Sequence, residues 1–227
     1  MTSAKTIAQN LQDDQEQLPS FEVLYERYYI RVYRYLRTHV QHDEDAADLA
    51  QHVFLQVWKQ RHSYRPGRGS LATWLFSIAH NRLVDFYRTA RPAVSWEAVP
   101  EISVVEQDPE AIAISAETLA QVKKLLEELP QIERELLSLR FAARLSSAEI
   151  AQVIGKSEAA TRKQLTRLIH RLRERYKRLS FEELLDLLEM EQSEFTAILE
   201  RAYRITLPGD LLQRVQQNLL QRIETAL

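Results

Sequence analysis

A basic stretch near residue 160 carries side chains suited to reading base pairs in duplex DNA. Between Gly155 and Arg178 there are nine lysines and arginines against two glutamates, a net charge of +7. Arginine pairs with guanine, and glutamate can accept a hydrogen bond from cytosine. The predicted DNA-contacting residues are Glu158, Arg162, Lys163, Thr166 and Arg167. For a basic helix taken alone, a hydrated charged face is an equally good explanation.

The elements that would position these residues favour DNA binding over that alternative. Ser146–Glu149 matches a capping box, which predicts a helix start. This short helix ends at Gly155, and Ser157 caps a second helix that runs to about Arg178. The two helices can pack through Ala151, Ile154, Leu165, Leu168 and Leu172. A short helix, a glycine turn and a basic helix predict a helix-turn-helix, whose second helix enters the major groove.

A second group of residues mixes cations, aromatic rings and an amide. Single-stranded DNA is held by a cationic groove with aromatic faces for its bases. The loop after residue 63 and the helix that follows it contain these ingredients: Tyr64, Arg65, Arg68, Trp74, Asn81, Arg82, Asp85, Phe86, Tyr87, Arg88 and Arg91. Trp74 and Phe86 fit equally well as core residues, because they recur at helical spacing. This signal alone is weak.

Enzyme chemistry finds little support in the sequence. His39 and His42, with Asp48 and His52 one turn apart, suggest a metal site, but no fixed spacing supplies the remaining ligands. Glu182, Glu183, Asp186 and Glu189 suggest catalytic carboxylates, but a solvated helix face explains them better. The chain has no cysteine and no glycine-rich phosphate loop. We therefore expect no metal, no cofactor and no catalytic activity.

Charge is segregated along the 227 residues, although the whole chain carries only −2. Residues 93–118 contain six acids and no basic residue, and residues 180–227 contain nine acids against four arginines. Blocks of opposite sign indicate separate binding surfaces. The N-terminus lacks a secretory signal, and no apolar run reaches the about 18 residues that span a bilayer. We expect a cytoplasmic protein without membrane insertion.

Apolar spacing predicts an all-α fold with two helical domains, an acidic linker and a C-terminal helical extension. A helical pattern starts at Phe21, and Ser70 is a plausible cap for a helix that Pro92 stops. The last helix places Leu212, Val215, Leu219 and Ile223 on one face, after a turn at residues 208–210. The expected segments are a polar N-terminus (1–20), the first domain (21–92), the linker (93–118), the second domain (119–178) and the extension (179–227).

The two domains resemble regions 2 and 4 of the extracytoplasmic-function group of the sigma-70 family. Residues 21–40 and Asp43–Trp58 resemble the polymerase-binding part of region 2. Residues Gly69–Arg88 resemble the helix that melts DNA and reads the minus-ten element. Residues 129–151 and the helix-turn-helix resemble region 4. The resemblance covers about two-thirds of the chain, with both motifs in the expected order.

This resemblance implies a role in transcription initiation for particular residues. The residues implied to bind core RNA polymerase are Asp45, Asp48, Leu49, Gln51, Val53 and Phe54. Those implied to meet minus-ten DNA are Arg65, Arg68, Ser70, Asn81, Arg82 and Arg88. The recognition residues of the helix-turn-helix would touch the minus-thirty-five element. The implied partners are core polymerase, promoter DNA and an anti-sigma factor.

Two questions stay open from the sequence. The alternative function is a polymerase-independent regulator whose helix-turn-helix binds an operator as a dimer, but it leaves Asp43–Trp58 without a role. The acidic extension either folds back and shields one of the two domains, or extends the region 4 core, or docks a separate regulator. An amphipathic helix must bury its apolar side against something, so each option is physically reasonable.

Overall fold

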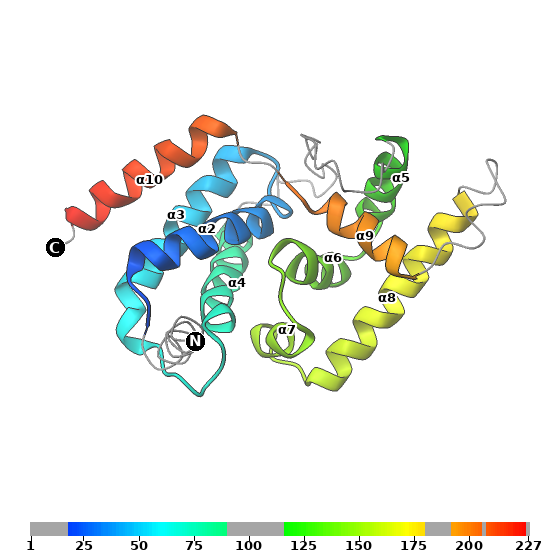
Figure 1. Ribbon diagram of the computed structural model, residues 1–227, viewed down its shortest axis with the longest axis horizontal. Helices are drawn as coiled ribbons and strands as arrows, with labels where there is room; N and C mark the ends of the chain where they lie inside the picture. Colours follow the sequence, from blue (N-terminus) through cyan, green and yellow to red (C-terminus); the bar gives the residue numbers. More distant parts are fainter. Residues whose placement is uncertain (1–17, 90–115, 180–191, 206–207, 226–227) are drawn as a thin grey trace, which may run out of the picture.

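The computed structural model describes residues 18–89, 116–179, 192–205 and 208–225, and its regular elements in these ranges are all helical. Most of the expected N-terminal segment and linker therefore lies outside the described residues. Figure 1 shows two groups of helices side by side, with the C-terminal helices running across both. The predicted all-α class is confirmed.

The first group is a bundle of α2 (Phe21–Arg37), α3 (Asp43–Gln60) and α4 (Leu71–Thr89), with a short turn of helix, η1 (Arg61–Ser63), between the last two. Ser20 caps α2 by accepting a hydrogen bond from the amide of Val23. Aromatic rings fill the interior, where Phe54 packs edge-on against Tyr25 at a centroid distance of 5.1 Å. Burial of such large rings is the main source of stability for a small bundle.

The second group contains α5 (Ala116–Glu127), α6 (Gln131–Leu137), α7 (Ser147–Val153) and α8 (Glu158–Leu179). α6 continues into one wider turn, η2 (Ser138–Ala142), whose Ser138 and Leu139 are buried. α5 begins at Ala116, inside the segment expected to be linker. The helix thus starts three residues before the expected boundary. Glu117 was counted with the acidic linker, but an acid in the first turn of a helix is favoured by the helix dipole.

Two further helices, α9 (Gln192–Ala202) and α10 (Gly209–Glu224), make up the described part of the extension. α9 packs against α5, α8 and η2, whereas α10 packs against α3 of the first group. The predicted turn at residues 208–210 is shorter in the structure, because Pro208 already precedes the first helical residue, Gly209. Proline suits this position since its fixed φ is compatible with a helix start.

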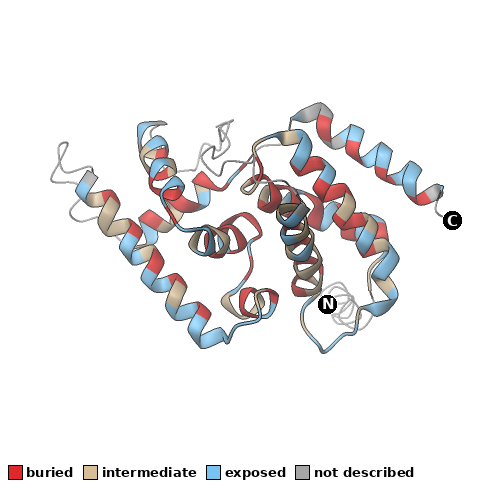
Figure 2. Ribbon diagram, turned by 180° about the vertical axis from the view of Figure 1, so that it is seen from behind, coloured by how far each residue is buried: buried red, intermediate tan, exposed pale blue. Residues whose placement is uncertain are grey.

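The two groups share one apolar core. α4 packs against α7, and α2 packs against η2, so the interface involves both halves of the chain. Figure 2 shows buried residues lining the inner sides of both groups and the inner side of α10. The relative position of the two groups is thus fixed by side-chain packing and not only by the intervening chain.

Candidate nucleic-acid and polymerase interfaces

The helix-turn-helix forms as the local sequence predicts. The Ser146 hydroxyl accepts a hydrogen bond from the amide of Glu149, whose carboxylate in turn accepts one from the amide of Ser146 at 2.8 Å. Gly155 has a φ of 67°, in the region that glycine adopts without strain. Ser157 caps α8 through the amide of Ala160. The predicted packing residues are buried, except for the half-buried Ile154.

The start of α8 presents a free basic face. Each of the five residues predicted to contact duplex DNA is exposed: Glu158, Arg162, Lys163, Thr166 and Arg167. The hydroxyl of Thr166 donates to the carbonyl oxygen of Arg162 at 3.0 Å. Thr161 faces the opposite way and is fully buried, so the helix has one packed side and one side available for a groove.

The loop before α4 and α4 itself hold the residues expected at minus-ten DNA. Arg65, Arg68, Ser70, Asn81 and Arg88 are exposed, and Arg82 is half-buried. The Ser70 hydroxyl caps α4 by accepting from the amide of Thr73 at 3.1 Å, as predicted. Trp74 and Phe86 are half-buried and pack against the core, which agrees with the structural interpretation given for these two rings.

A contact that the sequence did not indicate joins this loop to the helix-turn-helix. The Ser70 hydroxyl donates to the Glu149 carboxylate at 2.6 Å, across 79 positions of the chain. Hydrogen bonds and the cation of Arg31 lower the pKa of Glu149 against the opposing effect of burial. A residue expected beside melted DNA is thus engaged by α7 in this structure.

The expected polymerase-binding residues of α3 divide into two kinds. Asp45 and Asp48 are exposed. Gln51 is only 5% exposed, and Leu49, Val53 and Phe54 belong to the core. A buried side chain cannot contact a partner without a rearrangement. Leu49, Val53 and Phe54 therefore hold α3 in the bundle, and the two aspartates are the residues of this set that a partner can reach.

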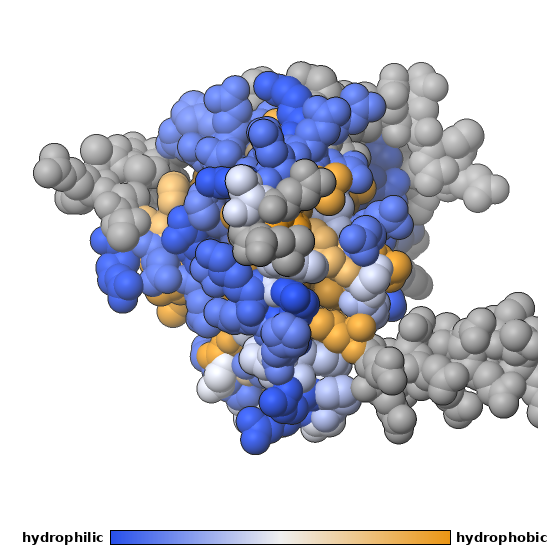
Figure 3. Space-filling view, turned by 90° about the vertical axis from the view of Figure 1, so that its left-hand side faces the viewer, coloured by the Kyte–Doolittle hydropathy of each residue, from blue (hydrophilic) through white to orange (hydrophobic). Residues whose placement is uncertain are grey.

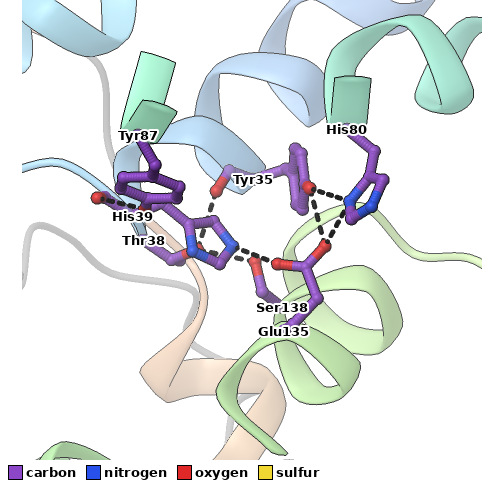
Figure 4. Close-up of polar contacts among 7 residues, drawn as sticks. All are labelled: Tyr35, Thr38, His39, His80, Tyr87, Glu135 and Ser138. Carbon is purple, nitrogen blue, oxygen red and sulfur yellow. Dashed lines mark hydrogen bonds and ion pairs between the residues drawn. The ribbon is translucent and has the colours of Figure 1, made fainter. Parts of the chain in front are cut away.

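A buried polar cluster centred on Glu135 joins the two helical groups (Figure 4). The Tyr35 hydroxyl donates to Glu135 Oε1 at 2.7 Å, and His80 Nδ1 lies 3.0 Å from the same oxygen. His39 Nε2 forms an ion pair with the other oxygen at 2.9 Å. Burial alone would raise the pKa of the Glu135 carboxyl, but the charge of His39 and these hydrogen bonds hold it well below its usual value.

Further hydrogen bonds extend this cluster along the same interface. Thr38 Oγ1 lies 2.6 Å from Ser138 Oγ, and the Tyr87 hydroxyl donates to the carbonyl oxygen of His39 at 2.8 Å. The cluster therefore draws on α2, α4, α6 and η2. No local pattern in the sequence links residues so far apart, which is why this site was not predicted.

The residues considered for enzyme chemistry do not converge. His39 is engaged by Glu135, while Asp48 is exposed and half-buried His52 contacts the Asp48 backbone carbonyl oxygen. Among the described residues, no three histidine, aspartate or glutamate side chains are grouped as a metal site would require. The four acids from Glu182 to Glu189 lie outside the described residues. No helix in the described ranges is both long and apolar enough to cross a membrane.

Comparison with known proteins shows the family to which this chain is similar. The sequence matches the family description Sigma-70 region 2 over residues 24–92, and Sigma-70, region 4 over residues 119–172. The ECF RNA polymerase sigma factor SigD of Mycobacterium tuberculosis is 33% identical over 149 residues, which cover 63% of this chain and 70% of that protein. The chain belongs to the ECF sigma factors. The predicted family is confirmed.

Other sigma factors extend the comparison. The ECF RNA polymerase sigma factor SigX of Bacillus subtilis is 28% identical over 174 residues, covering 74% of this chain and 88% of SigX. The sigma factor RpoE, solved in complex with the anti-sigma factor NepR from Bartonella quintana, shares the fold with a TM-score of 0.52. It is 19% identical, and the match covers 68% of this chain and 94% of that chain.

Membership in this family decides between the two functions considered for the chain. ECF sigma factors are transcription factors and not an enzyme family. The chain is a sigma factor that binds core RNA polymerase and recognises promoter DNA to start transcription. The polymerase-independent regulator is not favoured.

Proposed function

We propose that this sigma factor reads the minus-thirty-five element through the exposed face of α8. The observation that carries the proposal is the position of Arg162, Lys163 and Arg167, which are all exposed on the first half of the second helix of a helix-turn-helix. This is the part of such a helix that reaches base edges. Thr166 and Glu158 lie on the same exposed surface and complete the proposed contact set.

The loop and helix at residues 64–89 are proposed to hold the melted minus-ten strand. Exposed Arg65, Arg68 and Arg88 supply cations for the backbone, and exposed Asn81 supplies an amide for a base edge. Half-buried Arg82 adds a fourth cation beside them. Ser70 joins this surface only after its bond to Glu149 has opened.

The exposed aspartates of α3, Asp45 and Asp48, are proposed to dock on core polymerase. Recognition at two promoter elements by one polymerase-bound subunit makes DNA binding bivalent, so each contact can be weak alone. We further propose that the protein acts in the cytoplasm, where polymerase and chromosome meet, and that it needs no metal, cofactor or catalytic residue of its own.

Run-off transcription with purified core polymerase tests this function. The full chain, added to core enzyme and a library of promoter fragments, should give discrete transcripts that core enzyme alone does not give. The triple variant Arg162→Ala, Lys163→Ala, Arg167→Ala should lose them while still co-purifying with core. Arg175→Ala is the matched control on the same helix, because Arg175 pairs with Glu128 far from the proposed base contacts.

The alternative function, a polymerase-independent regulator, would give the opposite results in these experiments. Such a protein would bind duplex DNA as a dimer without polymerase and would give no transcript with core enzyme. Sedimentation of the free protein with duplex DNA distinguishes the two, since a sigma factor should need core polymerase for tight binding.

A further inference from the structure

The C-terminal extension holds both sigma domains at once. It lies beyond the residues that match the two sigma regions, which end at residue 172. α9 is embedded in the region 4 half: Phe195 and Leu199 are fully buried, and Phe195 packs against Tyr176 at a ring distance of 5.7 Å. This helix therefore completes the region 4 core.

The chain after α9 crosses from region 4 to region 2. Tyr203 stacks on Phe141 of η2 at 5.8 Å. Two residues later, the carbonyl oxygen of Ile205 accepts a 2.8 Å hydrogen bond from Arg34 Nε of α2. The crossing segment is thus fixed to both domains by specific contacts.

α10 then lies along α3, as Figures 1 and 2 both show. Its apolar stripe is buried: Leu211, Val215, Leu219 and Ile223. Neighbouring Gln213, Gln216 and Gln217 are exposed, so the helix has one polar and one packed side. On the side of the molecule that Figure 3 shows, hydrophilic residues predominate and hydrophobic ones form separate patches.

We propose that α10 and core polymerase compete for α3, and that the extension is a built-in restraint on this sigma factor. The proposal rests on the docking role proposed above for α3. α10 already packs on α3, so a partner that extends from the exposed Asp45 and Asp48 onto the side where α10 lies has to displace it. The closed arrangement also keeps Ser70 bonded to Glu149, so polymerase docking and minus-ten recognition are restrained together. Free protein binds core only in the fraction of time that α10 is released.

A single substitution on α10, with its neighbour as control, tests the restraint in the full chain. Leu219 is 1% exposed and Leu220 is 42% exposed, so Leu219→Asp breaks the packing on α3 while Leu220→Asp adds the same charge outside it. We expect Leu219→Asp to bind core polymerase about tenfold more tightly than wild type, because the competent fraction rises. Leu220→Asp should bind within about twofold of wild type.

The outcomes separate this proposal from the proposed function. If Leu219→Asp binds core equally or more weakly and its circular dichroism is unchanged, the restraint is wrong even though the wild type directs transcription. A second measurement follows α10 directly. Because the chain has no cysteine, Gln56→Cys on α3 and Gln217→Cys on α10 accept a fluorophore pair at two exposed positions. Energy transfer should fall when core polymerase is added, and unchanged transfer in the bound state overturns the proposal.

A different observation points to an anion site at the same junction. A cavity of about 380 Å³ opens between α2, η2 and the end of α9. Four arginines line it, with one carboxylate from Glu200: Arg34, Arg140, Arg144 and Arg204. Burial, and then the cations of Arg144 and Arg204, lower the pKa of Arg34. The arginines around this cavity therefore repel one another, and a bound anion would reduce that repulsion.

The backbone at Arg144 supports the same conclusion. Arg144 has a φ of 55°, and it is the one residue other than glycine with a positive φ in the described ranges. An arginine in this conformation carries strain that glycine would avoid. Strain of this kind often accompanies a functional role. We infer that the cavity binds a compact anion with several phosphate groups, which guanidinium groups recognise through paired hydrogen bonds.

Calorimetric titration of the full chain with inorganic tripolyphosphate tests this site. Arg144→Gly removes one cation and relieves the strained φ, so the fold should persist. We expect it to weaken binding about tenfold, whereas Arg222→Gln, which removes an exposed cation on α10, should leave the affinity unchanged. The basic α8 will bind the probe in both variants. Equal affinities for Arg144→Gly and wild type therefore assign all binding to α8 and overturn the inference.

Discussion

Glu135 is the centre of the buried polar cluster that joins the two sigma domains. Its side chain is largely buried and meets His39, His80 and Tyr35 from the opposite domain. A buried carboxylate that keeps its charge needs compensating partners, and here each oxygen has at least one. In the sequence, His39 fits a metal ligand equally well, because spacing shows that a histidine is present but not which distant carboxylate it faces.

We predict that Glu135→Gln lowers the free energy of unfolding by about 3 kcal/mol, since it leaves buried His39 without its anion. Urea denaturation measures this value. Glu133→Gln is the control: Glu133 pairs with Arg171 near the surface, so its loss should cost less than about 1 kcal/mol. Equal effects of the two variants would show that the cluster adds nothing beyond a surface pair.

The same residue predicts a pH dependence. The pKa of Glu135 lies below its usual value of 4.5, so the folded state favours the charged form. Its stabilisation is therefore complete above pH 4.5 and is lost as the pH falls further toward the folded-state pKa. The stability difference between wild type and Glu135→Gln should shrink as the pH is lowered from 5 to 3 in urea titrations. A difference that grows in this range would contradict the assignment.

On the surface of α8, single arginines should have separable effects. We expect Arg162→Ala and Arg167→Ala each to weaken binding of polymerase holoenzyme to minus-thirty-five duplex by about 1–3 kcal/mol, if each pairs with a guanine. Electrophoretic mobility shifts with matched and scrambled promoters measure both affinity and selectivity. Unchanged values in both variants would move the recognition surface away from these residues.

At the scale of helices, the sequence correctly predicted the features that depend only on residues within one helical turn. The caps at Ser70, Ser146 and Ser157 are confirmed, because a hydroxyl and an amide three residues apart fix them locally. The α10 stripe was also expected, although Leu211 is one of its buried members and the side chain of Leu212 lies outside the described set. The partner of α10 was left open, since an amphipathic pattern shows that a face is buried but not against which helix.

The exposed aspartates of α3 give the test at this scale. We predict that Asp48→Arg weakens core polymerase binding at least tenfold, because reversing a charge in an interface slows association and leaves a mismatched pair. Stopped-flow association at two salt concentrations is the measurement. Glu26→Arg, an exposed residue on α2, applies the same charge change elsewhere on region 2 and should have little effect. Normal binding by a folded Asp48→Arg variant would place docking on another surface.

At the scale of the molecule, the two sigma domains and the extension form one closed body. Arg31 of α2 donates two hydrogen bonds to the carbonyl oxygen of Ala143, at 2.9 and 2.7 Å, beside the Glu135 cluster. Apolar residues of both domains belong to the same core. The sequence predicted two domains correctly but not their closure, because the contacts that join them span about a hundred positions and leave no periodic signal.

Closure predicts the way in which the free protein unfolds. Domains that share a core should unfold in one cooperative transition with equal calorimetric and van't Hoff enthalpies. Arg31→Ala combined with Glu135→Gln removes the Arg31–Ala143 hydrogen bonds and the Glu135 carboxylate from the interface, so its scan should broaden or divide into two transitions. Glu133→Gln combined with Arg175→Ala removes two surface ion pairs within region 4 and should keep one transition. If wild type itself shows two separate transitions, the domains fold independently, and a closed free state cannot restrain polymerase binding.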